Sequence, residues 1–193
     1  MVVASVVALL VLVTVVVVAF TSSTNPLSAK LLSGSQVPSA WQSADYGKAV
    51  SGFGCLSKVL NPSGFHATAE TDVLYINHRT LPPEVGEFIA TYRNTATTYQ
   101  SEVTSLAHCK RINGGENPSG ISGSVTTLNF PKSGASSAAF VASISDEAVP
   151  VTVTQDIVIV KKGRYVLEIF ETNLGKVNQN QFEKFISSAL AKI

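Results

Sequence analysis

The sequence VTVTQDIVIVKKGRYVLEIF, residues 151–170, decides the fold of this chain. Val151–Val160 and Tyr165–Phe170 are both rich in the β-branched and aromatic residues that favour strands. Between them lies the turn Lys161–Arg164, in which Gly163 can adopt the positive φ that a tight connection needs. This stretch therefore predicts an antiparallel β-hairpin.

Four further segments are predicted to be strands because β-favouring residues dominate them: Phe65–His78, Glu84–Tyr92, Val125–Phe130 and Ser136–Ser145. Two of them leave an alternative open. Glu84–Tyr92 can also be read as a helix, which Gly86 disfavours, and the alanines of Ser136–Ser145 suit a helix as well as a strand. We expect strands in both places.

Two segments have the apolar spacing of amphipathic helices. The first is Thr95–Cys109, with an apolar stripe of Ala96, Tyr99, Val103, Leu106 and Ala107. The second begins near Asn178, with an apolar stripe of Phe182, Phe185, Ile186, Ala189, Leu190 and Ile193. Successive strands without crossover helices imply antiparallel pairing. The expected fold is α+β: a twisted, mainly antiparallel sheet of five to six strands with two main helices on one face.

The N-terminal segment Met1–Phe20 contains no charged residue. As a helix, twenty residues would span about 30 Å, the thickness of the hydrocarbon core of a bilayer. Two interpretations compete: an uncleaved transmembrane helix, and a signal peptide cut after Ala19. The apolar run is longer than the usual signal core of about 7–15 residues, so the anchor is favoured.

The first charged residue is Lys30, so no basic residue precedes the apolar run. Both signal peptides and anchors normally carry one, and we therefore expect the native start to lie upstream. No cysteine follows the run at a lipidation distance, which argues against a lipoprotein. The expected organisation is 1–20 anchor or signal segment, 21–36 stalk rich in Ser, Thr, Asn and Pro, and 37–193 extracytoplasmic domain.

The composition excludes several classes of protein. Of the 193 residues, 45% are hydrophobic and 14% are charged, with a formal net charge of +1. Because much of the hydrophobicity lies in the first twenty residues, the rest resembles one ordinary globular domain. A polytopic membrane protein, a disordered chain and a strongly basic nucleic-acid binder are all excluded.

The chain has two cysteines, Cys55 and Cys109. In an exported domain, two cysteines favour one disulfide. The alternative is a pair of buried free thiols.

No catalytic or metal-binding motif stands out. The chain lacks phosphate-binding and dinucleotide-binding glycine motifs, and its three histidines, His66, His78 and His108, lack metal-ligand spacing. We therefore expect no cofactor, no metal and no catalysis. The weak candidates for ligand binding are His78 and Arg79, which could hold an anion at the rim of the sheet or simply form a solvated strand end.

The basic turn Lys161–Arg164 has two possible roles. It could contact an anionic lipid headgroup or a cell-wall polymer, or it could keep the hairpin tip soluble.

Taken together, the apolar anchor, the stalk with Leu31-Leu32, Cys55 before a loop and strand, the helix ending in Cys109 and the terminal helix ending Ala191-Lys192-Ile193 resemble a known group. This pattern is similar to the extracellular sensor domain of the mycobacterial PknH-type serine/threonine kinases. The resemblance implies an α+β domain with a ligand-binding cleft and pairing of Cys55 with Cys109. The chain lacks the second disulfide that members often carry, and it lacks a kinase domain.

We therefore expect a membrane-tethered, extracytoplasmic binding or sensor-like domain that meets an unidentified cell-envelope ligand or protein, with no nucleic-acid partner. It would lie at the cell membrane as a single-pass protein, or be secreted after signal cleavage. The alternatives are an assembly factor that acts by protein contact and, third, a small envelope hydrolase.

Overall fold

A computed structural model describes residues 25–46, 55–56, 65–77, 83–110, 112–113, 121–131, 136–146 and 149–193. The predicted membrane segment 1–20 lies outside these residues. Within them, no helix has both the length and the apolar character needed to cross a membrane.

One antiparallel sheet organises the described chain, with the strand order β1-β2-β3-β8-β7-β6-β5-β4. The strands are β1 Trp41–Ala44, β2 Ala69–Asn77, β3 Glu84–Thr91, β4 Ile112–Asn113, β5 Ile121–Thr127, β6 Ser136–Asp146, β7 Val149–Lys162 and β8 Tyr165–Leu174. The predicted strands are confirmed, but the sheet has eight strands, or seven without the two-residue β4, rather than five to six. The strands β1 and β4 were not predicted, because they are too short to show the alternation of apolar and polar residues that identifies a strand.

The predicted hairpin lies at the centre of the sheet. β7 and β8 pair along their length, with Lys162 opposite Tyr165, and Gly163 has a φ of 59° in the turn between them. The two expected helices are confirmed as α3 Thr95–His108 and α4 Gln179–Leu190, and each begins after an asparagine cap. Asn94 and Asn178 each accept a hydrogen bond from the third backbone N–H that follows.

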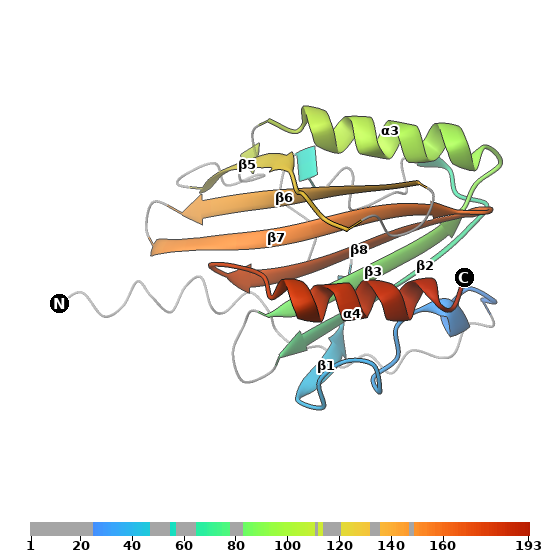
Figure 1. Ribbon diagram of the computed structural model, residues 1–193, viewed down its shortest axis with the longest axis horizontal. Coiled ribbons are helices and arrows are strands. Elements are labelled where there is room, and N and C mark those ends of the chain that lie inside the picture. The colour runs from blue at the N-terminus through green and yellow to red at the C-terminus, as the bar shows by residue number, and fades with distance from the viewer. Residues whose placement is uncertain are drawn as a thin grey trace.

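The helices lie on opposite faces of the sheet, so the expectation of two helices on one face is wrong. Ile157 and Ile159 of β7 pack in the same apolar cluster as Leu106 of α3. The alternate residues Val158 and Val160 pack with Phe182 and its neighbours on α4. A strand with a continuous apolar run is buried on both faces, and each face then needs its own cover. Figure 1 shows α4 crossing in front of β8 and β3, with α3 along the other side of the sheet.

The described part of the predicted stalk belongs to the folded domain. Leu27, Leu31 and Leu32 are buried in the cluster beneath α4, around a short 3-10 helix, η1, at Ser28–Lys30. The backbone N–H of Leu32 donates to a carboxylate oxygen of Glu87 in β3. The domain therefore includes residues from Asn25 onward.

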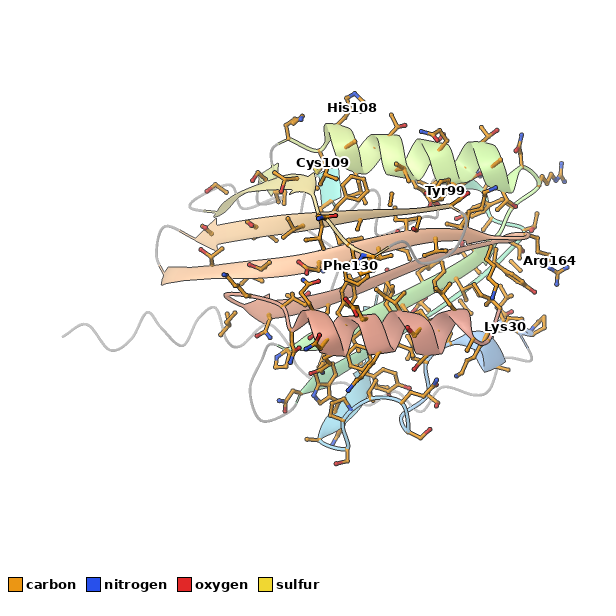
Figure 2. All side chains as sticks on the ribbon, viewed as in Figure 1. Lys30, Tyr99, His108, Cys109, Phe130 and Arg164 are labelled. Atoms are coloured by element: carbon orange, nitrogen blue, oxygen red, sulfur yellow. A yellow bond between two sulfur atoms is a disulfide. The ribbon has the colours of Figure 1, made fainter. Side chains whose placement is uncertain are left out.

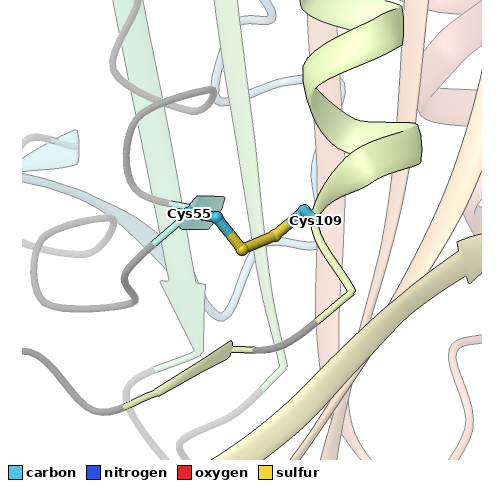
Figure 3. The surroundings of a disulfide bond; sticks show 2 residues. All are labelled: Cys55 and Cys109. Atoms are coloured by element: carbon cyan, nitrogen blue, oxygen red, sulfur yellow. A yellow bond between two sulfur atoms is a disulfide. The ribbon is translucent and has the colours of Figure 1, made fainter.

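The structure contains the expected disulfide between Cys55 and Cys109, with the two Cα atoms 5.6 Å apart. Figure 3 shows that Cys109 directly follows the last turn of α3. The disulfide therefore fixes the C-terminal end of this helix to a segment 54 residues earlier in the chain.

Gly86 provides a direct test of the packing between β3 and β8. An alanine Cβ at this position would lie 2.3 Å from Cζ of Phe170, whose ring is 1% exposed. We predict that Gly86→Ala lowers the free energy of unfolding by about 1–3 kcal/mol, measured by urea denaturation. Gly34→Ala is the matched control, because nothing lies within 4 Å of the added Cβ there. Equal losses in the two variants would contradict this packing.

Candidate functional site

The structure tests one of the two sequence-predicted groups of site residues. Cys55 and Cys109 are joined, as predicted. His78 and Arg79 lie outside the described residues. The candidate site therefore consists of polar groups that the described sheet brings together.

A broad polar surface lies on the α4 side of the sheet, beyond the helix. It comprises seven hydroxyl-bearing side chains from three neighbouring strands: Ser122, Ser124 and Thr126 of β5, Ser143 and Ser145 of β6, and Thr152 and Thr154 of β7. We call this set the hydroxyl face. Strand alternation places it on the α4 side, because Thr154 is in step with Asp156 and Val158. No described helix crosses this part of the sheet in Figure 1.

The register arranges these hydroxyls in rows across the strands. Ser124 pairs with Ser143, Ser143 with Thr154, and Thr154 with Asn173 of β8. Neighbouring strands lie about 4.8 Å apart, and alternate residues on one strand about 6.8 Å apart. Ser143 and Thr154 at the centre are half-buried, whereas the outer hydroxyl residues are exposed. The result is a lattice of uncharged hydrogen-bond donors and acceptors.

A buried pair of carboxyl groups borders the hydroxyl face where α4 begins. Asp156 of β7 lies directly opposite Glu171 of β8, and their exposed fractions are 2% and 1%. The side-chain amide of Gln179, the first residue of α4, donates to Asp156. Burial and the neighbouring Asp156 raise the pKa of Glu171 to about 8, so that a proton is retained at the pair near neutral pH.

A second buried polar cluster lies on the other face, beneath α3. It consists of Tyr46, Tyr92, Glu102 and Glu168, each at most 7% exposed. The Tyr92 hydroxyl donates to Oε1 of Glu102 over 3.3 Å. Oη of Tyr46, Oε2 of Glu102 and Oε1 of Glu168 have no hydrogen-bond partner among the described residues.

Both carboxyl groups of this cluster favour the protonated form. Burial raises the pKa of Glu102 to about 7, against the opposing effect of the hydrogen bond from Tyr92. Burial, and then the proximity of Glu102, raise the pKa of Glu168 well above its ordinary value. On the α4 side, burial likewise raises the pKa of Glu87 to about 7. The folded domain thus holds several acidic groups that take up protons near neutral pH.

These buried groups are poorly placed for catalysis. A general acid or base must reach its substrate within hydrogen-bonding distance, and carboxyl groups that are 1–2% exposed do not. Among the described residues, no cluster of three or more His, Cys, Asp or Glu side chains could hold a metal ion. Most residues of the hydroxyl face, in contrast, are exposed and can offer hydrogen bonds to a ligand.

Sequence reasoning missed both the hydroxyl face and the buried acids. A signal for the acids was present, because Glu168 stands inside the apolar run of β8 and Asp156 precedes the apolar run of β7. The hydroxyl face shows in the sequence as Ser or Thr at alternate positions, such as Ser122, Ser124 and Thr126. That pattern does not reveal which strands are neighbours, and the lattice depends on it.

The comparisons with known proteins support the fold. No protein-family model matches the chain, and no curated protein sequence matches it. Among solved structures, the extracellular domain of PknH from Mycobacterium tuberculosis is similar, with a TM-score of 0.63 and 10% sequence identity. The match covers 88% of this chain and 96% of that one. This confirms the PknH-like fold that the sequence resemblance implied, and at this identity it shows the fold alone.

The raised pKa of Glu102 predicts how stability depends on pH. Glutamate titrates near 4.5 when unperturbed, so the neutral form persists to higher pH in the folded state. Its contribution to stability is complete below about pH 4.5 and is lost as pH rises through about 7. The unfolding free energy, measured by urea titration, should therefore fall between pH 5 and 8 by about 2–3 kcal/mol less in Glu102→Gln than in the unaltered protein.

Glu183→Gln, at a half-buried position of α4, is the control, and its unfolding free energy should decline with pH as that of the unaltered protein does. If Glu102→Gln lost stability as steeply as the unaltered protein, the assignment of this proton to the α3 cluster would be wrong.

Proposed function

We propose that this chain is a membrane-tethered, extracytoplasmic binding domain of the sensor type, which acts without catalysis and meets its ligand through the hydroxyl face. The observation that supports it most is the array of hydroxyl groups on β5, β6 and β7, which no described helix covers, in a fold similar to an extracellular domain. The apolar segment 1–20 and the Cys55–Cys109 disulfide both suit a domain outside the cytoplasm.

The chemistry of the hydroxyl face selects a class of ligand. Serine and threonine hydroxyls both donate and accept hydrogen bonds, and they carry no charge. A neutral, hydroxyl-rich polymer such as a cell-envelope glycan offers the same groups in an extended arrangement. The face extends over three strands, so one bound segment can meet several rows at once.

The rigid border of the face supports a binding role. Asp156 and Glu171 lie in the row that contains Thr126, and the amide of Gln179 holds Asp156 beside the start of α4. A ligand lying along the lattice would therefore approach the first turn of α4. Its presence could be transmitted to this helix without any covalent step.

The carboxyl pair is also the feature on which an envelope hydrolase would depend. Paired carboxyl groups with separated pKa values are used in glycoside hydrolysis. Here Asp156 and Glu171 are both at most 2% exposed, and the side-chain amide of Gln179 donates a hydrogen bond to Asp156. This burial favours binding over hydrolysis.

The proposal is tested by sedimentation of the full chain with purified, insoluble cell-wall polysaccharide. We predict binding that weakens at least about tenfold in the variant Ser124→Glu/Thr126→Glu, because two carboxylates then occupy the uncharged lattice without partners. Both positions are exposed, so the variant should keep its thermal midpoint.

Thr97→Glu/Ser101→Glu is the matched control, with the same charge added to exposed positions of α3 on the other side of the sheet. It should bind as the unaltered chain does. Failure of the unaltered chain to bind, or equal losses in both variants, would overturn the assignment of the hydroxyl face.

A further inference from the structure

Six cations gather at one end of the domain, where the β7–β8 turn lies. They are Lys30 of η1, Arg93 after β3, Lys161 and Lys162 at the end of β7, Arg164 in the turn, and Lys192 after α4. We call this set the basic end. The register brings the strands together here, because Tyr165 lies opposite both Lys162 and Thr91. Figure 2 shows Lys30 and Arg164 at this same end of the molecule.

Tyr165 and the backbone hold several of these cations in place. The Lys30 ammonium lies 5.2 Å from the centre of the Tyr165 ring, and the Arg164 guanidinium lies 5.3 Å from it. Lys30 also donates to the carbonyl of Lys192 over 3.0 Å, and Lys162 to the carbonyl of Leu190 over 2.9 Å. Carbonyl groups and an aromatic ring orient a cation but leave its charge in place.

The basic end carries a larger share of positive charge than the composition of the whole chain would suggest. The chain has 14 Lys and Arg residues and a net charge of +1, yet six of these cations lie here. Hydrogen bonds to carbonyl groups account for Lys162, which binds Leu190 at the negative end of α4, and for Lys192, which binds Leu31 beside η1. They do not account for Arg93 and Arg164, which are exposed.

The chain enters the domain at the basic end. The predicted membrane segment ends at Phe20, and Leu27 is buried in the domain, three residues before Lys30. The intervening chain can reach at most about 25 Å when fully extended. Any membrane that holds residues 1–20 therefore lies within this distance of the point where the domain begins.

We propose that the basic end docks on the anionic headgroup surface of the bilayer that holds residues 1–20. This inference rests on the membrane tether of the proposed function, and it adds an orientation. Lysine and arginine near an anionic surface each strengthen attachment about fivefold, and tyrosine favours the headgroup layer. The hydroxyl face, which extends toward the opposite ends of β5, β6 and β7, is then directed away from the membrane.

The test uses the full chain reconstituted in vesicles of purely zwitterionic lipid and in vesicles with about 30% anionic phospholipid. Hydrogen exchange is measured at residues 161–165 and 190–193. We expect exchange at these residues to be at least about fivefold slower in the anionic vesicles. Salt at about 1 M should abolish the difference, since it shortens the screening length to about 3 Å.

Arg93→Glu/Lys161→Glu/Arg164→Glu should abolish the protection while sparing the lysines that bind carbonyl groups near the end of α4. The matched control is Lys110→Glu/Lys176→Glu/Lys184→Glu, which makes the same change of net charge at exposed positions away from this end and should keep the protection. Thermal midpoints of both variants establish that they are folded.

Three outcomes would overturn the proposal, and they differ in whether the membrane tether of the proposed function fails as well. Release of the chain by alkaline extraction would remove the tether as well. If the chain stays in the vesicles but hydrogen exchange in the hairpin is equal in both kinds of vesicle, the docking is disproved and the tether stands. Protection by added soluble polyphosphate in zwitterionic vesicles, without protection by anionic lipid, would assign the basic end to a soluble polyanion.

Discussion

The burial of the central strands on both faces is the constraint on which the rest of this structure depends. The run Ile157–Val160 of β7 sends alternate side chains into two separate apolar clusters. Each cluster needs its own cover, which α3 provides on one side and α4 together with Leu27, Leu31 and Leu32 provides on the other. Because α4 has 12 residues and lies over β8 and β3, no described helix covers the parts of β5, β6 and β7 that carry the hydroxyl face.

The same alternation places acidic side chains in the interior. Glu87, Glu168 and Glu171 lie at core positions of β3 and β8, each directly beside a buried apolar residue in the chain. Burial keeps such groups protonated at a pH where exposed carboxylates are charged. These groups therefore make their full contribution to stability below about pH 4.5, and groups whose pKa is raised to about 7 or 8 lie on both faces of the sheet. A reaction centre would need access that these groups lack.

Local features were predictable from the sequence, and long-range placement was not. The β7–β8 hairpin, the asparagine caps of α3 and α4, and the disulfide each depend on neighbouring residues or on a simple cysteine count. The two-sided cover is not predictable from the hairpin alone, because the sequence of β7 indicates a strand but does not show which helix covers each of its faces. The hydroxyl face and the basic end both depend on strand order, which joins residues as distant as Ser124 and Thr154, or Lys30 and Tyr165.

The most direct test of the central claim is amide NMR of the full chain in lipid nanodiscs, titrated with soluble fragments of neutral cell-wall glycan. If the glycan binds the hydroxyl face, chemical-shift changes will be concentrated at residues 122–126, 143–145 and 152–154, with smaller changes at Gln179 and none along α3. Changes confined to α3, or no changes at the residues of the hydroxyl face, would contradict binding at this face.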